Sequence, residues 1–276
     1  MDRYAVIGNP VEHSRSPFIH ARFAEQTRQA IEYERVLAPL DGFAGAVRAC
    51  AQRGLRGCNV TLPFKFEAWA LAERLTPRAA LAQAVNLLRF DGDGAGWFGD
   101  NSDGIGLLRD IEINARLSLA GRSVLLLGAG GAAAGVLGSL LQARPRQLVV
   151  ANRSAGKAVA LVERHAGVAR ECGVALAIGT GDGPFDVVIN ATSASLHGGA
   201  EDIVSSSALG DGTLVLDMMY GAAAQPFLRW ASARGAAARD GLGMLVEQAA
   251  ESFECWRGVR PATAPVLAAL REQLDR

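Results

Sequence analysis

Residues 125–133 read Leu-Leu-Leu-Gly-Ala-Gly-Gly-Ala-Ala, an apolar run that leads into a glycine-rich turn. A strand before such a turn and a helix after it are the context in which the G-x-G-x-x-G/A fingerprint binds a dinucleotide. Gly128 would allow the tight turn, Gly130 would let the backbone approach a pyrophosphate at the helix N-terminus, and Ala133 would keep the helix close to the sheet. The stretch predicts a dinucleotide-binding site, the alternative being a plain turn between strand and helix. The nucleotide contacts are expected from Gly128, Ala129, Gly130, Gly131 and Ala132.

The segment after the next predicted strand, residues 147–151, indicates which dinucleotide fits. It reads Asn152-Arg153-Ser154, with Lys157 one helical turn further, and contains no carboxylate. An NAD site needs an acidic residue here for the ribose hydroxyls, whereas NADP needs positive charge for its 2′-phosphate. Arg153 can stack on adenine and meet the phosphate, and Ser154 and Lys157 can donate to its oxygens. NADP is therefore favoured over NAD; the alternative is that these charges only solvate the end of the strand.

Residues 123–143, which surround the glycine-rich turn, carry no charge. The window is long enough to cross a bilayer. Its cluster of glycines is better explained by a strand, a tight turn and a buried helix. No membrane span is predicted.

Composition restricts the remaining possibilities. The chain has 276 residues, with 28 lysines and arginines against 28 aspartates and glutamates, so no global field draws it to nucleic acid or membrane. Its cysteines and histidines are dispersed, which predicts no disulfide framework and no metal site: Cys50, Cys58, Cys172, Cys255, His13, His20, His165 and His197. Met1 leads directly into a predicted strand without a signal peptide, and a cytoplasmic location is expected.

Short apolar runs alternate with helical patterns along the chain. This alternation predicts an α/β fold with a largely parallel sheet. Strands are expected at 4–8, 33–37, 57–62, 84–90, 123–127, 147–151, 185–190 and 213–218, and a turn at 91–94. Helices are expected at 16–24, 43–52, 64–75, 105–111, 242–256 and 264–270.

Residues 57–65, Gly-Cys-Asn-Val-Thr-Leu-Pro-Phe-Lys, place an amide, a hydroxyl and a lysine close together in an apolar run. Each such group would cost about 1–3 kcal/mol if buried without a partner, so the segment is expected to face a cleft that binds something polar. A partly desolvated lysine loses some preference for its charged form and can carry a proton near neutral pH. Lys65 is therefore a candidate acid/base, the alternative being an ordinary solvated lysine.

Taken in order, these and further segments resemble the shikimate dehydrogenase family along nearly the whole chain. The matching segments are NPVEHSRSP (9–17), NVTLPFK (59–65), AVN (84–86), GDNSDG (99–104), GAGGAA (128–133), NRS (152–154), NATS (190–193), DMMY (217–220) and GLGMLVEQA (241–249). The resemblance implies a substrate-binding domain of residues 1–104 and 241–276, with a Rossmann NADP domain of residues 105–240 inserted. It also implies reversible hydride transfer between NADP(H) and the carbon that links 3-dehydroshikimate and shikimate.

The resemblance also implies roles for individual residues. Ser14 and Ser16 would donate to the shikimate carboxylate, and the carboxylate or ring hydroxyls would be held by Asn59, Thr61, Asn86, Tyr220 and Gln248. Lys65 and Asp103 would form the catalytic pair, and Thr192, Met218 and Gly241 would join the cofactor site. Oxidising a secondary alcohol requires removal of its proton, which suits Lys65 as acid/base and Asp103 as its positioning partner. Asp103 can also be read as a helix N-cap.

Some positions depart from the family pattern. Leu87 stands where a threonine is usual, and the lost hydroxyl is expected to loosen binding; Ser195-Leu196 and Gly221-Ala222 replace other usual pairs. Two alternatives stay open: relaxed use of quinate or NAD, and a non-catalytic sensor that binds nucleotide and a small acid. A sensor would be free to lose Lys65 or Asp103, and both are present. The oligomeric state is open, with a homodimer as one assembly compatible with the sequence.

Overall fold

The computed structural model describes residues 1–92, 96–194 and 204–274. The chain divides into two compact units, which are described separately. Unit 1 comprises Met1–Gly106 and Leu245–Arg276, and unit 2 comprises Leu107–Met244. Each unit contains its own six-stranded sheet.

Unit 2 contains a fully parallel sheet with strand order β9-β8-β7-β10-β11-β12. In chain order this is the doubly wound arrangement 3-2-1-4-5-6 of dinucleotide-binding domains. The predicted Rossmann fold is confirmed. The strands are β7 (Ser123–Leu127), β8 (Gln147–Ala151), β9 (Ala175–Ile178), β10 (Val187–Asn190), β11 (Leu214–Asp217) and β12 (Ala237–Arg239).

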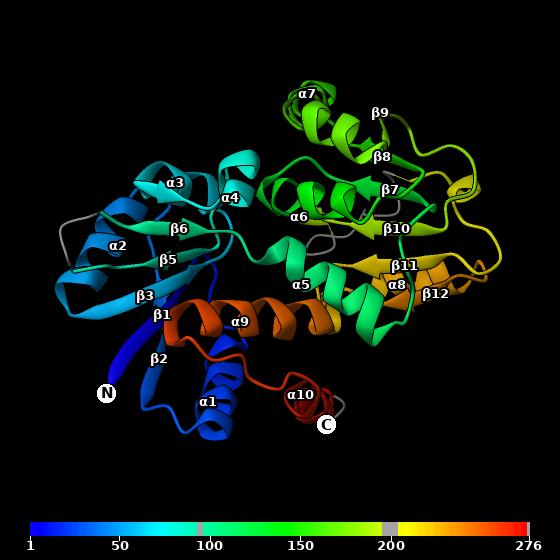
Figure 1. Ribbon diagram of the computed structural model, residues 1–276. Coiled ribbons are helices and arrows are strands. Elements are labelled where there is room, and N and C mark those ends of the chain that lie inside the picture. Colours follow the sequence, from blue (N-terminus) through cyan, green and yellow to red (C-terminus); the bar gives the residue numbers. More distant parts are fainter. Residues whose placement is uncertain (93–95, 195–203, 275–276) are drawn as a thin grey trace. The chain divides into compact units, whose positions relative to one another are not determined.

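Helices cover this sheet on both faces, which explains why β7 is apolar at nearly every position. Leu125 and Leu127 pack in one core cluster with Phe227 of α8, so Val124 and Leu126 point to the other face. Figure 1 shows α6 and α7 beside β7, β8 and β9, and α8 beside β11 and β12. The helical elements are α6 (Gly131–Gln142), α7 (Ala155–Cys172), α8 (Gln225–Ser232), the π-helix η1 (Asp110–Asn114) and the 3₁₀ turns η4 (Ser206–Ala208) and η5 (Gly221–Ala223).

The uncharged window of residues 123–143 forms β7, the glycine-rich turn and α6, as predicted. Within the described ranges, no helix is both long enough and apolar enough to cross a membrane.

Unit 1 contains a mixed sheet with strand order β2-β1-β3-β5-β6-β4. β1 pairs in parallel with β2 and β3, and β4 with β6, whereas β5 runs antiparallel to both β3 and β6. The largely parallel arrangement expected from the sequence is confirmed, with β5 as the antiparallel exception in this sheet. The strands are β1 (Asp2–Gly8), β2 (Ile31–Leu37), β3 (Leu55–Val60), β4 (Arg74–Leu75), β5 (Leu87–Arg89) and β6 (Phe98–Asp100).

The helix predicted at 64–75 is too long. It ends at Leu71, and a new helix starts at Pro77, capped by Thr76 Oγ1, which accepts from the Ala79 N–H at 3.3 Å. Proline at a first-turn position favours such a fresh start. The predicted strand 84–90 shortens to β5, and the predicted turn at 91–94 lies partly outside the described residues. The helices are α1 (Ser16–Thr27), α2 (Phe43–Gln52), α3 (Lys65–Leu71), α4 (Pro77–Ala82), α5 (Asp103–Arg109), α9 (Leu242–Arg257) and α10 (Ala264–Leu274).

A buried histidine lies in the aromatic core of unit 1. The His20 ring stacks on Tyr33 at a centroid distance of 4.2 Å, and Phe23 and Phe253 lie next to it. His20 is 0% exposed, and neither ring nitrogen has a hydrogen-bond partner in the described part of the chain. Burial lowers the pKa of His20 from 6.5 to about 3, and the Asn59 side chain offsets this only in part. The core therefore holds a neutral imidazole.

This histidine makes the stability of the fold dependent on pH. Between pH 6.5 and about 3 the unfolded chain binds a proton at His20 that the folded chain does not. Above pH 6.5 His20 does not reduce the free energy of unfolding. Below pH 6.5 its protonation in the unfolded chain lowers the free energy of unfolding by about 1.4 kcal/mol per pH unit. His20→Phe should remove this part of the slope in urea unfolding measured from pH 7 to pH 5. His13→Gln serves as the control for loss of an exposed histidine. Identical slopes for His20→Phe and wild type would disprove the assignment.

Candidate active site

The two residues proposed as a catalytic pair lie in contact in unit 1. Lys65 is the first residue of α3 and Asp103 the first residue of α5, and Lys65 Nζ donates to Asp103 Oδ2 at 2.5 Å. Their side chains are 11% and 6% exposed. Asp103 Oδ1 accepts from Asn86 Nδ2 at 2.8 Å, so both carboxylate oxygens are held. Among the described residues Lys65 Nζ has no other hydrogen-bond partner, which leaves the amine free to meet a ligand hydroxyl.

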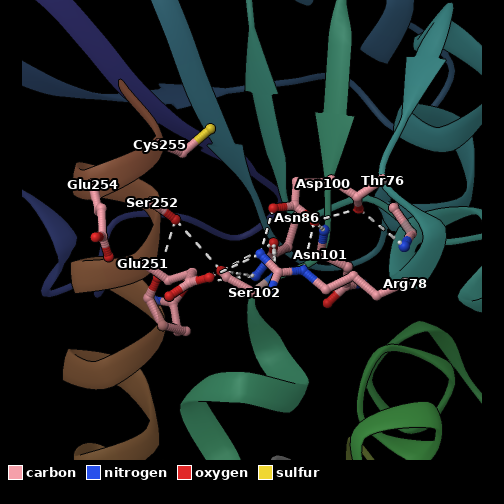
Figure 2. Close-up of polar contacts among 12 residues, drawn as sticks. Thr76, Arg78, Asn86, Asp100, Asn101, Ser102, Glu251, Ser252, Glu254 and Cys255 are labelled. Atoms are coloured by element: carbon pink, nitrogen blue, oxygen red, sulfur yellow. Dashed lines mark hydrogen bonds and ion pairs between the residues drawn. The ribbon is translucent and has the colours of Figure 1, made fainter. Parts of the chain in front are cut away.

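Asp100 fixes the segment that carries Asp103. Arg78 Nε and Nη2 donate to the two oxygens of Asp100 at 2.7 and 2.5 Å, and Arg78 Nη2 also donates to Glu251 of α9 at 3.0 Å. Figure 2 shows this arginine reaching both carboxylates. The Asp103 N–H donates to Asn101 Oδ1 at 3.1 Å, so Asn101 caps α5 rather than Asp103. The Asp103 carboxylate thus stays available for Lys65 and Asn86.

Asn86 orients Asp103 and is itself fully bonded. Its Nδ2 donates to Ser102 Oγ at 3.0 Å as well as to Asp103, and its Oδ1 accepts from the Ser102 N–H at 2.8 Å. Ser102 Oγ also donates to Gln248 Oε1 at 3.3 Å, which brings Gln248 of α9 into the same group. The Ser102 hydroxyl is therefore used inside the protein.

Tyr33 and Ser252, two residues that the sequence did not suggest, hold the Asn59 amide. Tyr33 Oη donates to Asn59 Oδ1 at 2.7 Å, and Asn59 Nδ2 donates to Ser252 Oγ at 2.9 Å and to the Asn86 carbonyl at 3.2 Å. Both N–H groups of Asn59 are thereby used. Figure 2 shows Ser252 on α9 joined to the group around Ser102. A serine four residues after Gln248 shares its helix face, which is the signal that could have identified it.

The two serines expected at the substrate carboxylate lie together before and at the start of α1. Ser14 Oγ donates to Ser16 Oγ at 3.2 Å. Arg35 Nε and Nη2 donate to the Ser14 carbonyl at 3.0 and 2.6 Å, which fixes this loop and places a positive charge beside it. Burial raises the pKa of the Tyr33 hydroxyl, whose hydrogen bond goes to Asn59.

The remaining predicted positions are distributed over both units. Thr61 follows β3 in unit 1, and its hydroxyl has no hydrogen-bond partner within the described ranges. Tyr220 lies in unit 2, immediately before η5, which begins with Gly221 and Ala222. Leu87 is fully buried in β5, in register with Asn59 and Asp100, and its effect on affinity stays a prediction. Ser195 and Leu196 lie outside the described residues.

The glycine-rich turn of unit 2 has the geometry of a pyrophosphate site. Gly128 has φ +111°, and a Cβ there would lie 3.1 Å from Thr192 Cγ2 and 3.2 Å from the Ala191 carbonyl. A Cβ at Gly130 would meet nothing within 4 Å, so the backbone faces open space where α6 begins at Gly131. Thr192 follows β10 and Gly128 follows β7, which places both at the switch point of the sheet, where nucleotides bind. The turn fits a dinucleotide.

The residues expected at the 2′-phosphate lie at the end of β8. Asn152 Nδ2 donates to the Ser154 carbonyl at 2.8 Å and shapes the turn, while Arg153, Ser154 and Lys157 are exposed. Positive charge is thus present where NADP requires it.

At the neighbouring loops of unit 2, Thr192 Oγ1 donates to Asn190 Oδ1 at 2.7 Å. Gly241 lies against Met218, since a Cβ at Gly241 would come 2.3 Å from the Met218 carbonyl oxygen. Over the described ranges no cluster of three or more histidine, cysteine or acidic side chains could hold a metal ion.

Family models match most of the chain. A shikimate dehydrogenase substrate binding domain matches residues 6–88, a shikimate/quinate 5-dehydrogenase model matches 112–217, and a shikimate 5′-dehydrogenase C-terminal domain matches 241–271. The first and last of these matched ranges lie largely in unit 1, and the middle range lies in unit 2.

Individual proteins are similar over their whole length. A Methylibium petroleiphilum protein named shikimate dehydrogenase (NADP(+)) is 61% identical, over 99% of this chain and 95% of its own. The crystal structure of an Ael1 enzyme from Pseudomonas putida matches with 45% identity and TM-score 0.86, over 98% of both chains. That of shikimate 5-dehydrogenase from Thermus thermophilus, in complex with NADP(H) and shikimate, matches with 30% identity and TM-score 0.84, over 99% of this chain and 100% of that one.

Proposed function

The chain belongs to the shikimate dehydrogenase family, and from this membership we propose how its residues catalyse the reversible reduction of 3-dehydroshikimate to shikimate by NADPH. The reaction belongs to aromatic amino-acid biosynthesis. The family, the activity and the cofactor expected from the sequence are confirmed by the relatives. We base the proposed roles of individual residues on the contact between Lys65 and Asp103. Asn86 donates to the same Asp103 carboxylate, and all three residues lie in unit 1.

In this proposal Lys65 moves the proton. When bound, NADP(H) supplies or accepts the hydride at the ring carbon. In oxidation the neutral amine of Lys65 takes the proton of the substrate hydroxyl, and in reduction the ammonium returns it to the developing alkoxide. Asp103 holds the amine through one oxygen and is itself oriented by Asn86 through the other. The pair thus fixes the geometry of proton transfer before substrate arrives.

The substrate-binding roles follow from which polar atoms are still available. Ser14 and Ser16 would donate to the carboxylate, with the charge of Arg35 beside them. Asn59 has no N–H group left to give, so it would accept from a ring hydroxyl rather than hold the carboxylate. The Thr61 hydroxyl is proposed as a further substrate ligand on the same ground, whereas Gln248 and Tyr220 are proposed from the family resemblance alone.

We assign substrate binding to residues 1–104 and 241–276, and NADP binding to residues 105–240. The geometry that supports the latter is the turn Gly128–Ala132 with the charged end of β8. The proposed cofactor ligands are Gly128, Ala129, Gly130, Gly131, Ala132, Asn152, Arg153, Ser154, Lys157, Thr192, Met218 and Gly241. We also propose that the protein is cytoplasmic. We further propose that it forms a homodimer, which sedimentation would test.

Isotope transfer tests this function. The protein should convert 3-dehydroshikimate with NADPH deuterated at C4 of the nicotinamide into shikimate, and NMR should find deuterium at C3. NADPH deuterated on the opposite face should give unlabelled shikimate. Label at another ring carbon, or unlabelled product with both forms of NADPH, would refute the proposed hydride transfer.

Removing the Tyr33 hydroxyl tests the positioning of Asn59. Tyr33→Phe takes away one hydrogen bond of about 1 kcal/mol, so KM for shikimate should rise about fivefold, with kcat and KM for NADP little changed. Initial rates at varied shikimate measure this. Tyr4→Phe is the matched control, because the Tyr4 hydroxyl lies near Arg257 instead. An unchanged KM in Tyr33→Phe would show that Asn59 needs no such support.

A further inference from the structure

Unit 1 has a concave surface lined by arginines. It is a pocket of about 430 Å³, and its charged lining consists of Arg56, Arg74, Arg89, Arg257, Asp2 and Asp91. Asp2 begins β1 and Arg56 lies near the beginning of β3, whereas the serine loop and Lys65 follow the opposite ends of these parallel strands. The pocket therefore lies near the N-terminal ends of β1 and β3, whereas Lys65 follows the C-terminal end of β3.

The pocket has more positive than negative charge. Asp91 accepts from Arg89 Nε at 2.8 Å and Nη2 at 3.1 Å, and also from Arg74. Asp2 likewise accepts from Arg257 and, at 3.5 Å, from Arg56 Nε. Among the described residues that line the pocket, the four arginines outnumber the two aspartates by two, although each arginine contacts one of them. A hydrogen bond from Arg89 lowers the pKa of Asp91, and one from Arg257 lowers the pKa of Asp2. Both aspartates are therefore ionised at neutral pH, and the excess of positive charge is two.

The pocket also contains a hydrogen-bond donor without a partner and a side formed by packed aromatic rings. Arg74 Nε is buried and lacks a hydrogen-bond partner in the part of the chain that the structure describes. The Arg56 side chain is 62% exposed, and among the described residues its guanidinium makes only the long contact with Asp2. Trp256 stacks on Tyr4 at 4.5 Å and donates through Nε1 to the Leu88 carbonyl at 3.2 Å, which fixes one side of the pocket.

We propose that this pocket binds a small anion with two negative charges, either a dicarboxylate or a phosphate monoester. The guanidinium fork matches the oxygens of both groups. The excess of two positive charges among the described lining residues matches two negative ones, and the volume lies within the usual range for small-molecule sites. The site is separate from the catalytic pair, and its existence does not depend on the proposed function.

Titration calorimetry of the loaded protein tests the proposal. Saturating NADPH and shikimate, which cannot react because both are reduced, fill the cofactor and substrate sites. Inorganic phosphate and succinate, each at an ionic strength balanced with sodium chloride, should then bind saturably with one site per chain. Tighter phosphate binding identifies the phosphate class, and tighter succinate binding the dicarboxylate class. Absence of saturable binding by both overturns the proposal.

Charge variants locate the binding. Arg56→Gln removes one exposed cation without disturbing the core and should weaken binding about fivefold. Asp91→Asn leaves a further positive charge in the pocket and should tighten binding by a similar factor, provided that its melting temperature shows a folded protein. Arg22→Gln, which loses the same charge on the exposed face of α1, should leave binding unchanged. Equal losses in Arg56→Gln and Arg22→Gln would assign the effect to net charge and refute the site.

Discussion

Lys65→Ala should lower kcat for shikimate oxidation by about 10²- to 10⁴-fold, the usual contribution of a positioned acid/base. The amine is the group in the Lys65–Asp103 pair that can take up and release the proton, since Asp103 is occupied by Lys65 and Asn86. KM for NADP should change little, because the proposed cofactor ligands are other residues. Initial rates of NADPH formation measure the effect.

Lys65→Arg sharpens this test. Of the 28 lysines and arginines in the chain, only Lys65 and Lys157 are lysines, so a lysine at position 65 is unusual for this protein. Arginine would keep the charge beside Asp103 but cannot release a proton at neutral pH. Lys65→Arg should therefore be nearly as inactive as Lys65→Ala. Substantial activity in Lys65→Arg would show that residue 65 acts through its charge and not by proton transfer.

Arg153→Ala should raise KM for NADP about 10- to 100-fold, because a hydrogen bond to a charged group contributes about 1.5–3 kcal/mol. Arg153 is exposed at the end of β8, where the 2′-phosphate is expected. KM for NAD should stay unchanged, since NAD lacks that phosphate, and so should KM for shikimate. Steady-state kinetics with both cofactors, together with NADPH fluorescence titration, measure this.

The control within the protein is Lys157→Ala, whose flexible point charge should have a smaller effect than the arginine fork. Equal increases of KM for NADP and NAD in Arg153→Ala would contradict the assignment of the 2′-phosphate to this residue.

The Rossmann unit could be predicted from sequence because its signals are local. Residues 125–133 specify strand, turn and helix within one short stretch, and Gly128 adopts the positive φ that the fingerprint requires. Unit 1 was harder. The antiparallel course of β5 depends on which strands it meets, and residues 87–89 do not encode that choice locally.

The site divides in the same way. Lys65 and Asp103 were paired by family resemblance, and no spacing rule joins residues so far apart in the chain. Tyr33 and Ser252 do not stand out in the sequence, because a strand tyrosine and a helix serine are common in any fold. Only folding brings them to the two ends of the Asn59 amide.

The most direct measurement is the rise in NADPH absorbance when purified protein is mixed with shikimate and NADP, with binding of each ligand followed in parallel. The account predicts rapid NADPH formation that is faster with shikimate than with quinate, faster with NADP than with NAD, and lost in Lys65→Ala. Saturable binding of shikimate and NADP without NADPH formation would contradict it and favour a non-catalytic sensor.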